Sequence, residues 1–495
     1  MRYFVLLKNF KKTLFVITAV FIAACELVSA PFSALAEELT RDDINAARMA
    51  MSASSDAIPG WPASPAIAAE SAVLMDADTG VILYSKNADV VHYPASTTKV
   101  MTCLLAAENC SLDEIVTFSH EAVYGIDRGS SNVGIDEGQA MTMEEALYCV
   151  MLASANEVAS AVAEHVGGSI ENFAKMMNER AAELGCTNTH FVNANGLPNE
   201  EHWTTAHDLA LITRAFNNNE TLRRIAGTNY YKMQASVSQP DTFDLANHHK
   251  MYPGNSYAYE YVTWGKTGYT NVARETLVTC AEKNGMNLVC TIMKDEPPYQ
   301  YTDTRELFEY GFNNFQKLYV DDNETAFDLD SSDFFDTESS IFGSTKSLLE
   351  LDSSGYCIVP NTVNFDDLEY SISYDTDNAD DIADINYSYE GVYVGGTSLR
   401  MTDIEASDFS FGTVSVSGNI EPVSNIKDED EKERNIIYVN IKILFIIIAV
   451  TVVLLIIILV FWLLFRKNSY SNRRRRNILK RNRRYGSEFD DFDFK

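Results

Sequence analysis

The chain has 495 residues, of which 46% are hydrophobic and 11% aromatic, so it can form two or more domains with real cores and is not a disordered protein. Its formal net charge is −31. Between residues 37 and 465 it carries 24 basic against 65 acidic residues, a balance that argues against nucleic acid or anionic lipid as the ligand of this part.

The N-terminus predicts a secretory signal peptide over residues 1–36. Four basic residues precede an uncharged stretch, which is followed by a small-residue site that ends at Ala36. We expect cleavage after Ala36. The alternative is a bacterial lipoprotein box that ends at Cys25 and leaves this residue as a lipidated N-terminus, but such an anchor would be redundant with the membrane span predicted below. Residues 37–61 are polar, rich in Ala and Ser, and predict an N-terminal arm.

Strands at both ends of a helical middle predict an α+β domain over residues 62–320. One strand pair surrounds a tight turn at Thr79-Gly80, and the other surrounds Asn284-Gly285. The apolar stretches between the two pairs have the length and spacing of helices. The predicted strands are residues 71–75, 81–84, 276–281 and 286–293, and the predicted helices are residues 97–107, 143–166 and 173–184.

The composition changes after residue 320. An acidic linker and short alternating segments predict a small β-rich domain over residues 321–424, and a charged stalk over 425–442 follows. Residues 443–465 form 23 positions without a charge, enough at about 1.5 Å per residue to cross a hydrocarbon layer of about 30 Å. The basic tail over residues 466–495 predicts a cytoplasmic C-terminus, so most of the chain is expected outside the cell membrane.

Seven cysteines remain after removal of the signal peptide, and they are scattered, which predicts mostly free buried thiols. Cys280 and Cys290 are the exception worth testing as a disulfide, because they could lie on adjacent strands around the second turn. The chain has no CxxC pair and no cluster of histidines in sequence, so no metal site and no cofactor are predicted.

Three short motifs together have the pattern of serine acyl transfer, which needs a nucleophile with a base, a second polar pair and a strand that holds the substrate. Each motif alone is weak, since a serine, an asparagine and a lysine also occur as a helix cap, a turn residue and a strand start. The candidate residues are Ser96 with Lys99, Ser154 with Asn156, and Lys266-Thr267-Gly268.

The first two motifs each occur more than once in the chain, so the neighbouring sequence must decide which copy is the candidate site. The first spacing recurs at Ser424 and Lys427, and the second at Ser130-x-Asn132 and Ser417-x-Asn419. We favour Ser154 because it follows one helical run and precedes another. Lys-Thr-Gly occurs once in the chain, directly before a predicted strand, where Gly268 allows close backbone approach and the strand edge can accept an extended peptide.

Residues from about 68 to 315 resemble the D-alanyl-D-alanine carboxypeptidase family, the low-molecular-mass penicillin-binding proteins that are serine peptidases. Beyond the three motifs, the resemblance includes Leu74-Met75-Asp76, Thr79-Gly80, Asn87-Ala88-Asp89, Pro94-Ala95-Ser96, Ser154-Ala155-Asn156-Glu157, Phe173, Met177-Asn178, Leu184-Gly185, Asn195-Gly196-Leu197, Gly265 to Thr270 and Tyr310-Gly311-Phe312.

This resemblance implies a catalytic domain of the serine D,D-peptidase and β-lactamase type, in which an antiparallel sheet with flanking helices lies beside an all-helical part. It implies removal of the terminal D-alanine from peptidoglycan stem peptides, with β-lactam antibiotics as inhibitors, at the outer face of a bacterial cell membrane. A small β-rich domain after the catalytic one is also common in the family. Relatives often end in an amphipathic helix, whereas this chain has a predicted full span.

The same resemblance implies the roles of the site residues. Ser96 and Lys99 would share one face of a helix, and burial together with the cation of Lys266 would lower the pKa of Lys99 so that it accepts a proton. The implied roles are nucleophile for Ser96, base for Lys99, proton relay for Ser154, amide holder for Asn156, carboxylate binding for Lys266 and Thr267, and oxyanion hole for the backbone N–H groups of Ser96 and Tyr269.

Two rival interpretations remain open. A β-lactamase shares the three motifs, but class A enzymes usually have Ser-Asp-Asn as the second and have no reason for a long C-terminal tail and anchor. A catalytically idle wall-binding or signalling protein could share the fold, but it would have no need to keep Ser96, Lys99, Ser154, Asn156 and Lys266.

Overall fold

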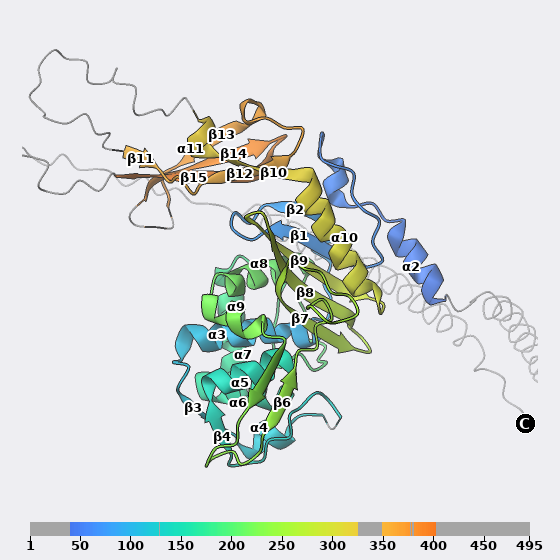
Figure 1. Cartoon of the computed structure of the whole chain (residues 1–495), viewed down its shortest axis with the longest axis vertical. Coiled ribbons are helices and arrows are strands. Elements are labelled where there is room, and N and C mark those ends of the chain that lie inside the picture. Colours follow the sequence, from blue (N-terminus) through green and yellow to red (C-terminus); the bar gives the residue numbers. More distant parts are fainter. Residues whose placement is uncertain (1–39, 128, 325–348, 377, 379–380, 402–495) are drawn as a thin grey trace, which may run out of the picture. The chain divides into compact units, whose positions relative to one another are not determined.

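The computed structural model describes residues 40–127, 129–324, 349–376, 378 and 381–401 (Figure 1). At its centre lies a five-stranded antiparallel sheet in the order β2-β1-β9-β8-β7. Both predicted strand pairs are present, and Asn284 and Gly285 have the positive φ angles that a tight hairpin turn requires. The strands are β1 (Ser71–Asp76), β2 (Ile82–Lys86), β7 (Val262–Thr270), β8 (Arg274–Lys283) and β9 (Met286–Asp295).

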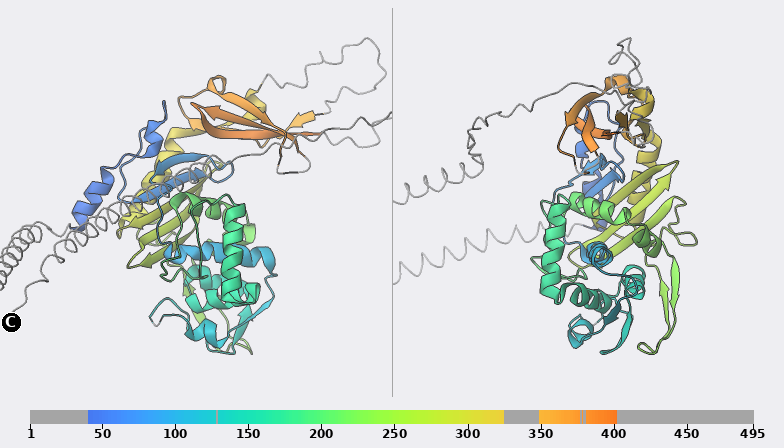
Figure 2. Two further views of the ribbon diagram at one scale, coloured as in Figure 1. Left: turned by 180° about the vertical axis from the view of Figure 1, so that it is seen from behind. Right: turned by 90° about the vertical axis from the view of Figure 1, so that its left-hand side faces the viewer.

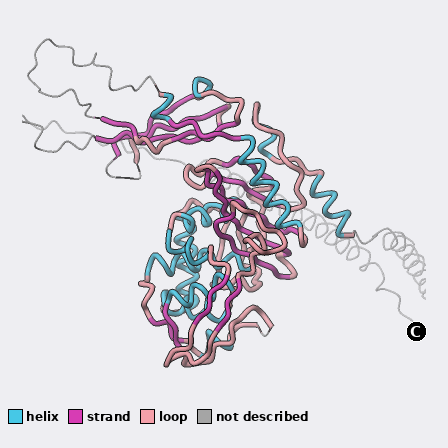
Figure 3. Tube along the Cα trace, in the orientation of Figure 1, coloured by secondary structure: helices cyan, strands magenta, loops and turns pink. Residues whose placement is uncertain are grey.

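Helices cover one face of this sheet, which confirms the α+β prediction (Figure 3). Helix α3 runs through the middle of the helical part, where the right-hand view of Figure 2 shows it end-on, and its residues from Lys99 to Ala106 are buried. The elements of this part are α3 (Lys99–Asn109), β3 (Ile115–Thr117), α4 (His120–Tyr124), β4 (Ala140–Thr142), α5 (Met143–Leu152), α6 (Asn156–Gly167), α7 (Ile170–Glu183), α8 (Ala206–Asn217), α9 (Glu220–Ala226), β5 (Tyr230–Met233) and β6 (Phe243–Ala246).

Helix α10 (Tyr299–Asn314) packs against the opposite face of the sheet, where a second apolar core also includes residues of a further sheet. This sheet, in the order β10-β12-β15-β14-β13 with β11 paired to β15, is the predicted β-rich segment. Its first strand already begins at Phe315, so the predicted boundary at residue 320 falls after β10. The elements are β10 (Phe315–Tyr319), α11 (Val320–Asn323), β11 (Leu349–Leu351), β12 (Tyr356–Pro360), β13 (Glu369–Ser373), β14 (Asp381–Tyr389) and β15 (Val392–Met401).

The described part of the predicted N-terminal arm is structured and packed against the catalytic domain. Helix α2 (Arg41–Met49) begins with a capping box in which Thr40 and Asp43 bond each other's backbone N–H groups. Arg48 is buried, and the indole N–H of Trp61 donates to the carbonyl of Leu83 at 2.8 Å.

One sequence-based expectation is wrong in detail, and the disulfide left open between Cys280 and Cys290 is not formed, in line with the expected free thiols. Lys266-Thr267-Gly268 lies within strand β7 rather than before a strand, because pairing with β8 outweighs the low strand propensity of glycine and lysine. Cys280 and Cys290 do lie on adjacent strands, but Cys290 is opposite Thr279. Since neighbouring residues of a strand face opposite sides of the sheet, the two thiols point into different cores and stay free.

The hydroxyl of Tyr356 in β12 connects the second sheet to the turn after β1, where it lies 2.8 Å from a carboxylate oxygen of Asp76 and 3.0 Å from one of Asp78. Asp76 is buried, and burial raises the pKa of its carboxyl group. We expect Tyr356→Phe to lower the free energy of unfolding by about 1–3 kcal/mol, since it removes a donor from a buried acceptor.

Urea unfolding of the full chain measures this effect. The matched control is Tyr319→Phe, because the Tyr319 ring packs against Tyr356 and is 41% exposed. Equal unfolding midpoints for the two variants would contradict a role for the Tyr356 hydroxyl.

Several predicted segments lie outside the described residues. These are the signal peptide, the acidic linker after residue 324, the stalk, the span over 443–465, the basic tail, and the alternative motifs at Ser417 and Ser424. Among the described residues, no helix combines the length and apolar character needed to cross a membrane.

Candidate active site

Ser96 lies in a short 3₁₀ helix, η2 (Ala95–Thr98), which continues directly into α3. Its Oγ is 3.0 Å from Nζ of Lys99, one turn further on, so the predicted pairing of these residues is present. Ala95 has a φ of +50°, a left-handed conformation that is unusual for a residue with a side chain. The backbone is therefore held in a strained turn directly before the candidate nucleophile.

The amine of Lys99 is fully buried and has three neighbours. Besides Ser96 Oγ, these are Oδ1 of Asn156 at 2.6 Å and the backbone carbonyl of Asn195 at 2.5 Å. The two carbonyl oxygens can only accept hydrogen bonds. A neutral amine has two N–H groups for them and one lone pair, which is left facing the Ser96 hydroxyl. This arrangement would suit Lys99 as a base beside the Ser96 hydroxyl, the roles expected from the sequence.

Ser154 lies in the turn between α5 and α6, as predicted, and Asn156 is the first residue of α6. Both side chains are buried, and Ser154 has a φ of +57°. Its Oγ accepts a hydrogen bond from Nζ of Lys266 at 3.0 Å. The alternative Ser130 lies in the loop before β4, where its exposed hydroxyl donates to the carbonyl of Asp127. The structure therefore brings Ser154, and not Ser130, next to Lys266.

Strand β7 forms the edge of the central sheet and carries the third motif past the nucleophile. A Cβ atom at Gly268 would be 2.9 Å from the backbone nitrogen of Ser96 and 2.4 Å from Oγ1 of Thr276. Glycine is thus required for β7 to lie this close to η2. Thr267 is half-buried and Tyr269 is 50% exposed, so the side chains of both reach solvent.

Burial controls the ionisation of the two lysines. It lowers the pKa of Lys99 well below its usual value, and the nearby cation of Lys266 lowers it further. Burial also lowers the pKa of Lys266, to about 7. The pair therefore favours a neutral Lys99 beside a Lys266 that changes charge near neutral pH.

This ionisation predicts the pH dependence of kcat/KM, which reports groups of the free enzyme. If Lys266 is the expected carboxylate-binding residue, kcat/KM for a peptide with a free C-terminal carboxylate should fall as the pH rises through about 7, because the Lys266 amine then loses its charge. In Lys266→Arg the cation persists to high pH, so the fall in kcat/KM should occur at a higher pH than in the unchanged protein. Stopped-flow penicillin acylation gives the same profile if peptide turnover is slow. Identical profiles for the two proteins would assign the fall to another group.

Sequence reasoning gave no role to the loop that carries Asn195 and Gly196, although this loop supplies the third neighbour of Lys99. Gly196 has a φ of +83°, and a Cβ atom there would be 1.8 Å from the carbonyl oxygen of Ala95. The loop is fixed to α3 by a hydrogen bond from Thr102 Oγ1 to the carbonyl of Ala194 at 2.6 Å. The Asn-Gly pair was the available signal, since it marks a turn with positive φ.

Comparisons with known proteins agree with this geometry. A family model described as D-alanyl-D-alanine carboxypeptidase matches residues 59–297. DacB2 of Mycobacterium tuberculosis, a D-alanyl-D-alanine carboxypeptidase, is 32% identical over 250 residues, which cover 49% of this chain and 82% of DacB2. The chain belongs to the D-alanyl-D-alanine carboxypeptidase family.

Two further relatives indicate how far the likeness extends along this carboxypeptidase-family chain. DacF of Bacillus subtilis is 33% identical over 258 residues, which cover 50% of this chain and 63% of DacF. The crystal structure of DacD from Francisella tularensis, at 20% identity, matches with a TM-score of 0.52 over 69% of this chain and 94% of DacD. This last match supports the fold alone, and it covers more of the chain than the 239 residues of the family model.

Proposed function

We propose that this protein is a serine-type D-Ala-D-Ala carboxypeptidase that removes the terminal D-alanine from peptidoglycan stem pentapeptides through an acyl-enzyme on Ser96. The observation that carries the proposal is the set of contacts around Lys99, whose Nζ lies within hydrogen-bond distance of Ser96 Oγ, Asn156 Oδ1 and the carbonyl of Asn195. In its neutral form the amine would donate to the two carbonyl oxygens and keep its lone pair for the Ser96 hydroxyl. Membership of the family supports the choice of substrate.

In the proposed reaction, Lys99 takes the proton of the Ser96 hydroxyl as Oγ attacks the carbonyl carbon of the penultimate D-alanine. The negative charge that develops on the carbonyl oxygen is stabilised by the backbone N–H groups of Ser96 and Tyr269. Collapse of this intermediate breaks the peptide bond and leaves an ester on Ser96. Water then attacks the ester, which releases the shortened peptide and restores the hydroxyl.

Ser154 would relay to the departing amine the proton that Lys99 took from Ser96, so that the Lys99 amine and the Ser154 hydroxyl both return to their starting states. Lys266 donates to its Oγ, so the hydroxyl hydrogen of Ser154 remains available for the leaving group. Lys266 and Thr267 would bind the free carboxylate at the end of the substrate, which explains cleavage at a chain terminus. The free edge of β7 would hold the peptide as an added strand, with Asn156 at the peptide amide.

We also propose that the protein is anchored in a bacterial cell membrane by residues 443–465, with the catalytic domain outside and the basic tail in the cytoplasm. The support is the uncharged 23-residue stretch and the cluster of basic residues directly after it. Protease added to intact cells should therefore remove the catalytic domain and leave the tail protected. Loss of the tail under the same conditions would contradict this orientation.

The activity is tested with the purified full chain and a pentapeptide that ends in D-Ala-D-Ala. We expect mass spectrometry to show the loss of one alanine, and prior treatment with penicillin to block it. The matched control is the same peptide ending in D-Ala-L-Ala, which should stay intact. No loss of alanine, or equal cleavage of both peptides, would contradict the proposal. Rapid hydrolysis of penicillin in place of a long-lived adduct would favour a β-lactamase.

A further inference from the structure

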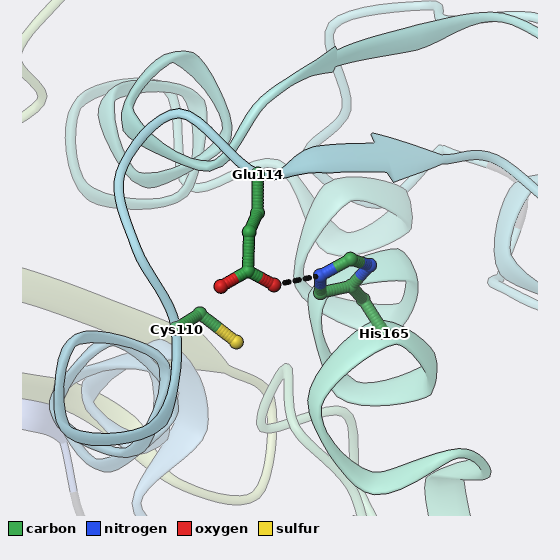
Figure 4. A group of neighbouring side chains, drawn as sticks. All are labelled: Cys110, Glu114 and His165. Atoms are coloured by element: carbon green, nitrogen blue, oxygen red, sulfur yellow. Dashed lines mark hydrogen bonds and ion pairs between the residues drawn. The ribbon is translucent and has the colours of Figure 1, made fainter.

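The geometry points to a metal site at Cys110, Glu114 and His165, on the side of the helical part where α3 and α6 end (Figure 4). We propose that it binds one divalent zinc ion. The thiol sulfur, one carboxylate oxygen and one imidazole nitrogen all lie within 4.8 Å of one another. Figure 4 shows the three side chains converging from a helix end, a loop and a second helix.

The donor atoms lie within about 1.5 Å of the separations that a zinc centre requires. With bonds of about 2.0–2.3 Å and tetrahedral angles, ligand atoms around zinc are about 3.3–3.7 Å apart. Nε2 of His165 and Oε2 of Glu114 are already 3.0 Å apart. The remaining adjustment is within reach of side-chain rotation, because all three residues are partly exposed at the surface.

The carboxylate of Glu114 is oriented by the backbone before any metal binds. Its Oε1 accepts a hydrogen bond from the N–H of Ser111 at 2.7 Å, which leaves Oε2 directed at His165. A hydrogen bond of this kind to a ligating group is what fixes the ligands of natural metal sites. The cluster therefore has an oriented ligand as well as three donor atoms.

The donor set selects the type of metal. A thiolate with an imidazole favours zinc over magnesium or calcium, which prefer oxygen ligands alone. The thiolate and the carboxylate together would neutralise the two charges of the ion. With three protein ligands, the fourth position would hold water, which is accessible because the Glu114 side chain is 42% exposed.

A bound ion would link the C-terminal ends of two helices whose N-terminal ends contribute residues to the candidate active site. Cys110 caps the C-terminus of α3, which begins at Lys99, and His165 lies in the last turn of α6, which begins at Asn156. These two helices pack against each other. A bound ion would therefore stabilise the pair without touching the reacting groups. This cluster could not be predicted from a sequence motif, because Glu114 and His165 are 51 positions apart in the chain.

Cobalt is the spectroscopic probe for this site. We titrate the metal-free full chain, without histidine tags, with CoCl₂ and then ZnCl₂. The expected result is one equivalent of bound cobalt with a thiolate-to-cobalt charge-transfer band, loss of the band on addition of zinc, and a higher thermal midpoint with zinc. Zinc should also protect Cys110 from alkylation by iodoacetamide.

Variants assign the ligands. Cys110→Ser should lose the charge-transfer band, and His165→Gln should bind cobalt at least about ten-fold more weakly, because even the loss of an outer-shell partner costs about 10–100-fold. The matched control is Cys186→Ser, which removes another partly buried thiol. Retained penicillin labelling shows that each variant is folded. A missing band, a band that survives in Cys110→Ser, or weak binding of several ions would overturn the proposal.

Discussion

Ser96→Ala should abolish the penicillin adduct and reduce the release of D-alanine by a factor on the order of 10⁴ or more, because the variant lacks the hydroxyl that forms the acyl-enzyme in the proposed reaction. The variant should stay folded, since the Ser96 side chain is only half-buried and its hydroxyl bonds Lys99 alone among the described residues. Gel fluorescence after labelling with a fluorescent penicillin measures the adduct, and mass spectrometry measures the alanine.

The chain provides its own control for this experiment. Ser424 also stands three residues before a lysine, so Ser424→Ala removes a serine from the same spacing. It should label at the rate of the unchanged protein. An adduct that persists in Ser96→Ala, or one that disappears in Ser424→Ala, would refute the assignment of the nucleophile.

Gly196→Ala should slow acylation by at least about 100-fold, because the new methyl group would lie 1.8 Å from the carbonyl oxygen of Ala95. Two backbone segments would then have to move apart by more than 1 Å, and a displacement of this size at a reacting group costs about that factor. The same movement would pull the carbonyl of Asn195 away from Lys99. Stopped-flow measurement of penicillin acylation gives the rate.

Gly138→Ala is the matched control for this substitution. Gly138 has the same φ of +83°, but a Cβ atom there has no neighbour within 4 Å. Gly138→Ala therefore measures the cost of placing alanine in the left-handed region, on the order of 1 kcal/mol, without a steric clash such as the one at Gly196. Similar acylation rates in the two variants would show that strain alone, and not the contact with Ala95, explains the effect.

Four of the five central strands and the main motifs could be predicted because each has a local signal, whereas β7 was not predicted. Asn284-Gly285 between two apolar stretches marks a hairpin, and β8 and β9 are present on either side of it. The Ser154 turn was predicted from its place between two helical runs. The pairing of Ser96 with Lys99 follows from their positions one turn apart.

The remaining features depend on tertiary contacts that have no local signal. The registers of β8 and β9 place Cys280 and Cys290 on opposite faces, and register is decided by the packing of both cores. The group of Asn195 that contacts Lys99 is its backbone carbonyl, so the contact cannot be predicted from a pattern of side chains. The Cys110, Glu114 and His165 cluster likewise exists only after α3 and α6 have packed.

The backbone is left-handed both at Ala95, directly before Ser96, and at Ser154, so two strained turns position the residues that carry the candidate hydroxyl groups. A rigid bicyclic drug and a flexible peptide would then meet the same prearranged pair. Sensitivity to penicillin and the speed of peptide cleavage should accordingly rise and fall together across variants of these turns. A substitution that relaxes these turns to lower penicillin binding would then also slow the proposed carboxypeptidase reaction.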